Sequence, residues 1–189
     1  MKHLRLLWLV IFGSLALAAA QDTNSLKTSL GQFEARTGVV IVRGYAPIGE
    51  TTAGPVEISV RCKETTDVGS GEKAYGLAFE ITGNASPRDR TLVDDDEIDA
   101  LLDALNYVIK SNYEVTNDKV TTLTSFEASY TTKAGLRVMA NSVRKEGGVQ
   151  YFIQSCNSPR IPLSGVEMTQ LYNLISQARK NLDDLKSGK

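Results

Sequence analysis

Two amphipathic stretches, seventy residues apart, constrain the fold of this chain more than any other feature. In the first, residues 92–109, apolar side chains recur three, four and seven positions apart, which places them on one face of a helix. A run of four acidic residues, 94–97, crowds its start, where carboxylates accept backbone hydrogen bonds and oppose the helix dipole. A second stretch, residues 163–185, repeats the pattern. The pairs related by the offset are Arg90 and Arg160, Glu97 and Glu167, Ile98 and Met168, Leu101 and Leu171, and Leu105 and Ile175.

Short alternating strands precede each helix, so the chain has the pattern of one strand-strand-strand-helix unit used twice. The continuous apolar run Val39–Val42 in the first strand predicts a central strand that is buried on both faces. Alternating strands and one-sided helices together predict an α+β fold, in which two helices pack on one face of an antiparallel sheet of about six strands. The six strands are expected at residues 37–45, 56–63, 75–81, 123–132, 136–144 and 149–156.

The first twenty residues have the pattern of a secretory signal peptide. Lys2 and Arg5 give it a positive start, and an apolar run over Leu6–Leu17 follows. Small residues at Ala18–Ala20 predict cleavage after Ala20, although an uncleaved membrane anchor is the alternative. The run is shorter than the roughly 20 residues that span a bilayer. We therefore expect a secreted or periplasmic protein without a membrane span after cleavage.

The rest of the chain has the length and composition of one compact domain. Residues 21–36 predict a weakly structured lead-in, because Gly31 interrupts a helical spacing of apolar residues. Residues 37–189 are expected to form a single α+β domain, with repeat halves at 37–110 and 122–186.

Removal of the signal would also remove His3, the only histidine of the chain. A Ser-His-Asp or Cys-His nucleophile and a histidine-ligated zinc site are therefore excluded within the mature chain. Of 21 basic residues, Lys2 and Arg5 leave with the signal, so 19 remain against 22 acidic ones, a net charge of −3. This balance is not that of a dedicated nucleic-acid binder. No glycine-rich nucleotide-binding motif occurs, and we expect no cofactor.

Cys62 and Cys156 are the only cysteines. In an oxidising compartment they could form a disulfide between the two repeats, and closing so long a loop contributes about 3–5 kcal/mol in the chain-entropy interpretation. The alternative is a pair of buried thiols, since Cys62 lies on an apolar strand face. A catalytic thiol is disfavoured, because the chain has no CxxC pair and would have no histidine partner once the signal is removed.

Two sets of carboxylates are candidate sites. The acidic run 94–97, with Asp99 and Asp103, could attract a hard cation, but it lacks the EF-hand pattern, and a solvated helix N-terminus is the favoured interpretation. The second set could supply the acid and base of a hydrolase, but nothing in the sequence places two of its members opposite each other. Its members are Glu57, Glu72, Glu80, Asp89 and Glu127. We therefore expect no catalytic, cofactor-binding or metal-binding residues.

The expected topology resembles two-repeat sheet-and-helix folds, including the whirly-type single-strand DNA binders, but no residue motif accompanies the resemblance and it implies no function. The sequence favours an exported, non-catalytic binding or interaction module, with an envelope or extracellular protein as its partner. A histidine-free hydrolase with paired carboxylates is one alternative. The other is a sheet-face binder of polyanions or single-stranded nucleic acid, for which interleaved aromatic and basic residues would be the signature.

Overall fold

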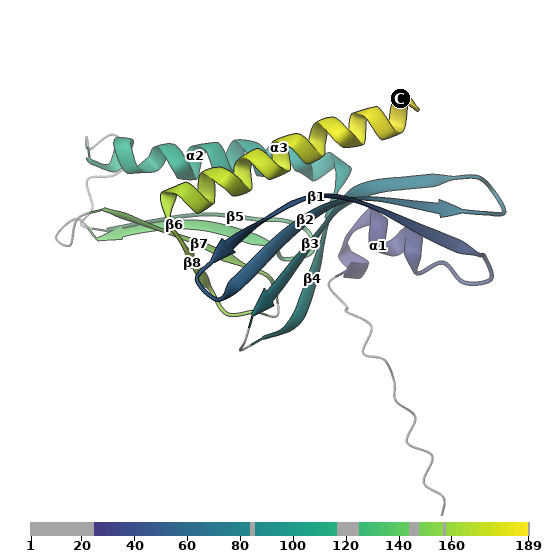
Figure 1. The fold of residues 1–189 in the computed structure, drawn as a ribbon, viewed down its shortest axis with the longest axis horizontal. Coiled ribbons are helices and arrows are strands. Elements are labelled where there is room, and N and C mark those ends of the chain that lie inside the picture. Colours follow the sequence, from purple (N-terminus) through teal and green to yellow (C-terminus); the bar gives the residue numbers. More distant parts are fainter. Residues whose placement is uncertain (1–24, 84–85, 117–124, 144–147, 157, 189) are drawn as a thin grey trace, which may run out of the picture.

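The computed structural model describes residues 25–83, 86–116, 125–143, 148–156 and 158–188. The expected signal peptide, residues 1–20, lies outside this range. The chain forms two antiparallel sheets of four strands each, with helices on their surfaces (Figure 1). The α+β class is therefore confirmed, and the expected single sheet of about six strands is wrong.

Each sheet is a meander in which neighbouring strands follow one another in sequence. Sheet A has the long strands and sheet B the short ones. Sheet A contains β1 (Ile41–Ala53), β2 (Val56–Asp67), β3 (Lys73–Gly83) and β4 (Ser86–Asp94). Sheet B contains β5 (Ser125–Thr131), β6 (Arg137–Val143), β7 (Val149–Gln154) and β8 (Ile161–Leu163).

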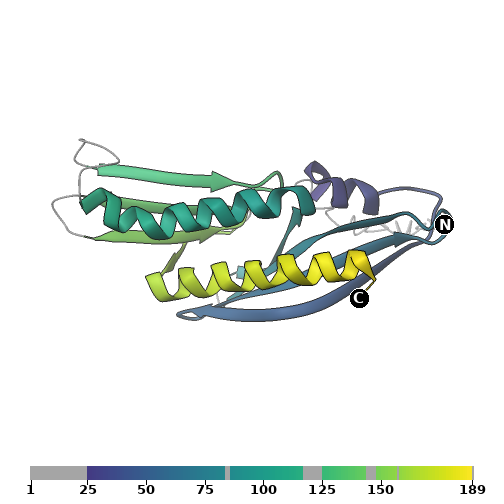
Figure 2. The same cartoon turned by 90° about the horizontal axis from the view of Figure 1, so that it is seen from above.

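The two long helices exchange sheets. Helix α2 (Ile98–Thr116) follows sheet A but packs on β5, β6 and β7 of sheet B. Helix α3 (Gly165–Ser187) follows sheet B but packs mainly on β1 and β2 of sheet A. The helices lie side by side above the sheets (Figures 1 and 2). Consequently each half of the chain covers the other half's sheet.

One hydrophobic core joins the two sheets and the two long helices. The apolar helical positions related by the seventy-residue offset all lie in it, as the periodicity predicted. Val166 and Leu185, whose spacing also fits the buried side of the second helix, are instead exposed. The strand pattern also predicted the buried face of β2 and β3 correctly. The fully buried members of these sets are Ile58, Val60, Cys62, Leu77, Phe79, Ile98, Leu101, Leu105, Met168, Leu171 and Ile175.

Both long helices begin with the same capping device, which explains the repeated glutamate. Ser164 Oγ accepts a hydrogen bond from Glu167 N at 3.2 Å, and Glu167 Oε2 accepts one from Ser164 N at 2.6 Å. In the first repeat Glu97 Oε2 accepts from Asp94 N at 3.4 Å. A short 3₁₀ turn, η2 (Asp95–Glu97), therefore precedes α2, and the helix begins at Ile98 rather than at residue 92.

A third helix packs on the opposite face of sheet A, away from α2 and α3 (Figure 1). The lead-in contains a 3₁₀ turn, η1 (Ser25–Lys27), followed by α1 (Ser29–Glu34). Thr28 Oγ1 caps α1 by accepting from Gly31 N at 2.9 Å. Leu30 is buried against Ala78 and Leu92 of the sheet in a small second cluster.

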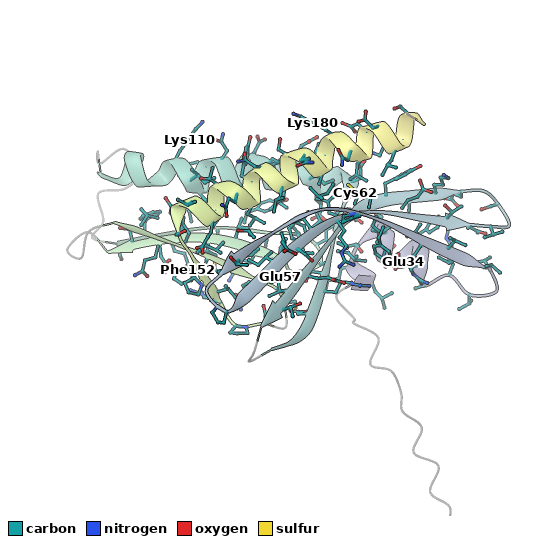
Figure 3. All side chains as sticks on the ribbon, in the orientation of Figure 1. Glu34, Glu57, Cys62, Lys110, Phe152 and Lys180 are labelled. Carbon is teal, nitrogen blue, oxygen red and sulfur yellow. The ribbon has the colours of Figure 1, made fainter. Side chains whose placement is uncertain are left out.

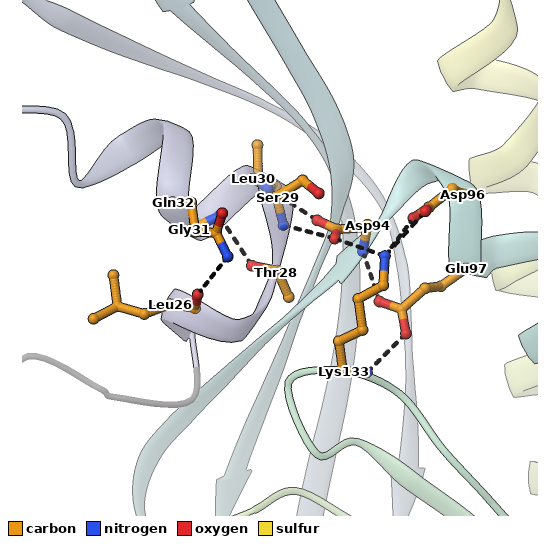
Figure 4. A network of polar contacts seen from close by, with 10 residues as sticks. All are labelled: Leu26, Thr28, Ser29, Leu30, Gly31, Gln32, Asp94, Asp96, Glu97 and Lys133. Carbon is orange, nitrogen blue, oxygen red and sulfur yellow. Dashed lines mark hydrogen bonds and ion pairs between the residues drawn. The ribbon is translucent and has the colours of Figure 1, made fainter.

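Asp94, at the end of β4, joins α1 to the rest of the fold (Figure 4). Its carboxylate accepts hydrogen bonds from the backbone N–H groups of Ser29, at 2.7 Å, and Leu30, at 3.0 Å. Lys133 Nζ, from the β5–β6 turn of sheet B, contacts the same carboxylate at 3.2 Å. Asp94 is 3% exposed, so its charge depends on these donors and not on water.

We predict that Asp94→Ala lowers the free energy of unfolding by about 2–4 kcal/mol, because it leaves a lysine and two backbone donors without their acceptor. Urea unfolding followed by circular dichroism measures the change. Asp103→Ala is the matched control, since Asp103 is an exposed residue of α2, and it should change the value by less than about 0.5 kcal/mol. Equal effects of the two substitutions would contradict the assigned role.

Candidate binding surface on sheet A

Exposed apolar side chains gather at one end of β1. Six of the nine large exposed hydrophobic residues described in the chain lie on β1, just before it or beside it. These six are Val39, Val40, Val42, Tyr45, Val68 and Leu185. Val40 is 67% and Val42 54% exposed, so the interpretation of Val39–Val42 as a central buried strand is wrong. The segment leads into β1, the edge strand of sheet A, which is hydrogen-bonded to β2 and to no other strand among the described residues.

Along the free edge of β1, the backbone N–H and C=O groups of alternate residues point away from β2. Val68 N donates to Val40 O at 3.0 Å, and the antiparallel register continues from Ile41 opposite Asp67. In an antiparallel ladder alternate residues bond to one neighbour, so the even-numbered residues of this segment bond to β2. The N–H and C=O groups of Ile41, Arg43 and Tyr45 therefore point outward.

Pro47 is compatible with this alternation. As an odd-numbered residue it would direct its N–H to the open side, so the N–H that proline lacks is not needed for a bond to β2. A β-bulge between Pro47 and Gly49 then shifts the register. Beyond the bulge, α3 covers the strand, and Thr51 Oγ1 donates to Gln170 Oε1 at 2.9 Å. The uncovered, regular part of the edge is therefore residues 41–47, which we call the β1 edge.

Behind the β1 edge, the outer face of sheet A carries a buried ion-pair network. Glu34, at the end of α1, accepts from Lys63 Nζ at 2.6 Å and from Thr65 Oγ1 at 2.7 Å, and pairs with Arg43 Nε at 3.2 Å. Burial opposes the ionisation of Glu34, but the hydrogen bonds from Lys63 and Thr65 outweigh it, so the pKa of Glu34 lies below its ordinary value. In Figure 3 Glu34 lies beside α1, on the face of sheet A that is turned away from α3.

A second carboxylate holds two arginines on the same face. Glu80 is 3% exposed and binds Arg61 at 3.1 Å and Arg90 through a close pair of hydrogen bonds. The ring of Tyr45 lies near two cations, with its centroid 5.3 Å from Lys63 Nζ and 5.5 Å from the Arg90 guanidinium. This face therefore interleaves an aromatic ring with cations, although Glu34 and Glu80 neutralise much of their charge.

A cavity of about 200 Å³ opens beside the β1 edge, where the sheet passes under the end of α3. Its lining comprises Gly44, Tyr45, Ala46, Cys62, Glu64 and Leu185. Cys62 lies beneath α3 (Figure 3), and its Sγ donates to the carbonyl of Ala178 at 3.3 Å. Burial raises the pKa of the Cys62 thiol to about 11, which keeps it protonated and unreactive at neutral pH.

Cys156 is exposed, and its Cβ packs near the backbone of Gly135 in the β5–β6 turn. No disulfide joins Cys156 to Cys62 in this structure. Of the two sequence-based alternatives, only the buried state of Cys62 is therefore seen, and Cys156 is not buried.

The acidic run at the start of α2 is only in part the solvated helix N-terminus that the sequence favoured, since Asp96, Asp99 and Asp103 are exposed. Asp94 and Glu97 are buried, and oxygen atoms of Asp94, Asp96 and Glu97 lie within 4.8 Å of one another. Lys133 occupies this cluster, with Nζ 2.9 Å from Asp96 and its backbone N–H 2.7 Å from Glu97. The cluster therefore binds an internal cation that holds sheet B to sheet A.

The carboxylates weighed for a hydrolase do not form an acid and base pair among the described residues. Glu57 and Glu80 lie diagonally on β2 and β3 of one face, but Glu80 is held as an ion by two arginines. Arg36 lowers the pKa of Glu72, which is the wrong direction for a general acid. Glu127 pairs with Arg160 at 3.7 Å, and Asp89 has a buried oxygen without a hydrogen-bond partner.

None of the described helices is long and apolar enough to cross a membrane.

Selective thiol labelling tests the cysteine environments. In native protein a maleimide should label Cys156 at least tenfold faster than Cys62, because Cys62 is buried and its pKa is raised. Unfolding without reductant should make both thiols react, and mass spectrometry of the peptides identifies each site. If neither thiol reacts in unreduced, unfolded protein, the two are bridged and the separate thiols seen here are not the state of the mature protein.

No family model, curated protein or solved structure matches this chain.

Proposed function

We propose that this chain is an exported, non-catalytic binding module that recruits its partner by strand addition at the β1 edge. Export is inferred from the signal pattern of residues 1–20. The observation that carries the binding function is the coincidence, on one short segment, of outward backbone groups and exposed apolar side chains. In strand addition the main-chain hydrogen bonds supply affinity, and the alternating side chains supply specificity.

The surroundings of the β1 edge support this function. The strand is held rigidly on its other side by β2, and Arg43 and Tyr45 are positioned by Glu34, Lys63 and Arg90. A partner strand would therefore meet an ordered template, which lowers the entropic cost of binding. The chemistry of the described residues points the same way, since they include no histidine and no carboxylate pair arranged for acid–base catalysis.

Proline substitution tests the function at the level of one hydrogen bond. Arg43→Pro removes an outward N–H and places a ring on the open side, while leaving the bonds to β2 intact. Arg43→Ala is the matched control, because it loses the same side chain and keeps the N–H. With residues 21–189 as bait in envelope extracts, we expect wild type and Arg43→Ala to retain the same protein at moderate salt.

Arg43→Pro should lose that protein, while its circular dichroism spectrum stays that of the wild type. Retention by the proline variant at the wild-type level would rule out the β1 edge as the binding site.

A second candidate function rests on Tyr45 and its flanking cations. An aromatic ring close to Lys63 and Arg90 is the pattern expected of a surface that binds single-stranded nucleic acid or another polyanion. The observation is weaker than the open edge, since Glu34 and Glu80 already bind four cations on this face.

The two functions differ in their response to salt and to Tyr45→Ala. If the face binds a polyanion, a fluorescent single-stranded oligonucleotide should bind at low salt, lose affinity steeply at moderate salt, and bind about tenfold more weakly to Tyr45→Ala. Arg43→Pro and Arg43→Ala should then weaken binding equally, because only the side chain matters. Our main proposal instead expects no oligonucleotide binding at moderate salt, as measured by fluorescence anisotropy.

A further inference from the structure

We infer that the partner at the β1 edge is a second copy of this chain, paired antiparallel about a twofold axis at Gly44. This inference rests on the proposed function, because it names the occupant of the same edge. It joins the two copies of sheet A into one continuous sheet, with β1 of each copy at the centre.

The hydrogen-bond phase restricts the registers that such a pair can adopt. The backbone N–H and C=O groups that point outward belong to Ile41, Arg43 and Tyr45. To bond with them, β1 of the second copy must place its odd-numbered residues opposite these odd-numbered residues. In a twofold antiparallel pair this requires the axis to pass through a residue and not between two residues. Only a few registers of the seven-residue edge therefore remain.

The axis at Gly44 is the register that uses the whole β1 edge. It places Ile41 opposite the second copy's Pro47, and Arg43 opposite the second copy's Tyr45, each relation occurring twice. Each Arg43–Tyr45 pair exchanges two main-chain hydrogen bonds, and each Ile41 N–H donates one to the carbonyl of Pro47. Because both relations occur twice, about six main-chain hydrogen bonds form. The missing N–H of Pro47 removes one bond from each end and none from the centre.

The side chains favour the same register. An axis at residue 43 sets two Arg43 side chains directly opposite each other, which is destabilising. With the axis at Gly44, each Arg43 instead lies opposite Tyr45 of the second copy, and its charge stays paired with Glu34 of its own chain. Like-charged residues are not opposed at any position of the edge in this register.

The inner face gains apolar contacts in this register. Val42 lies opposite Ala46 of the second copy, and the exposed Val40 lies opposite Ile48. Gly44 meets Gly44 at the axis, where the absence of side chains lets the backbones approach. The pairing therefore covers the apolar residues whose exposure marked this end of β1.

The space needed by a second copy is open among the described elements. Figure 2 shows β1 as the outermost strand of sheet A, with α3 above it and no helix or strand beyond it on the open side. Helix α1 packs mainly against β2, β3 and β4 on the outer face of the sheet, and it reaches β1 through the ion pair of Glu34 with Arg43.

A cysteine at the axis tests both the pairing and its register. Gly44→Cys, in a Cys62→Ala and Cys156→Ser background, places the two thiols at the closest cross-strand position, within the Cα separation that a disulfide needs. A Cβ at Gly44 meets only the carbonyl oxygen of Glu64 within 4 Å, at 3.8 Å, so the chain accommodates the substitution. We expect mild oxidation to give a covalent dimer, seen in a non-reducing gel.

Val42→Cys in the same background is the matched control. It lies on the same face of the same strand, but in this register the two residues 42 are four positions out of alignment and should not crosslink. Efficient crosslinking through residue 42 with none through residue 44 would overturn the register.

Sedimentation velocity of the mature chain tests the pairing without any cysteine. We expect twice the monomer mass at tens of micromolar, and at least a tenfold weaker association for Arg43→Pro than for Arg43→Ala. A monomer at that concentration, or a dimer unaffected by the proline, would overturn this inference. A monomer that still retains a different protein in a manner sensitive to Arg43→Pro would leave the proposed function standing, so the two failures are distinguishable.

Discussion

The exchange of helices between the two halves is the constraint on which the structure depends. Neither sheet is covered by the helix that follows it, so the buried face of each half forms only when the other half is present. Ion pairs fix the crossing, since Arg179 of α3 binds Asp95 at 2.8 Å and Asp99 at 3.1 Å at the start of α2. The Asp94–Lys133 contact links the sheets at the same point. Each unit of the repeat is local in sequence, but its helix packs on the sheet of the other unit, so the helix–sheet contacts of the core are non-local.

The parts of this fold that the sequence predicted are those decided by local periodicity. Glu97 and Glu167 indicated equivalent helix starts, and the structure has both in capping interactions. The apolar stripes of both helices and of β2 predicted the core faces correctly, because burial on one side imposes a period that packing does not alter. The burial of Ile58 on β2 and of Leu77 on β3 follows from the same rule.

What the sequence could not decide was which elements meet. Val39–Val42 has the composition of a buried central strand, yet the meander leaves it at an edge, because neighbour order is set by topology and not by composition. Strand β4 was hidden in a turn-like stretch, and three-residue β8 was too short to show a period. The network of Glu34 with Lys63 joins residues far apart in sequence, so spacing carried no signal of it. Pro47 was the one local sign of an edge.

An exposed edge is a hazard that proteins usually suppress with charges, prolines or bulges, and β1 has all three. Their placement decides how the edge behaves. Pro47 and the bulge stand where the uncovered part of the edge ends, just before the part that α3 covers, and Glu34 holds the guanidinium of Arg43 on the outer face. Residues 40–46 therefore keep exposed apolar side chains and backbone N–H and C=O groups that point outward, so this part of the edge is not protected against strand pairing. Pro47 and the bulge limit the length over which a second strand can pair with β1. A short edge that pairs with its own copy gives a closed dimer and not an open-ended sheet.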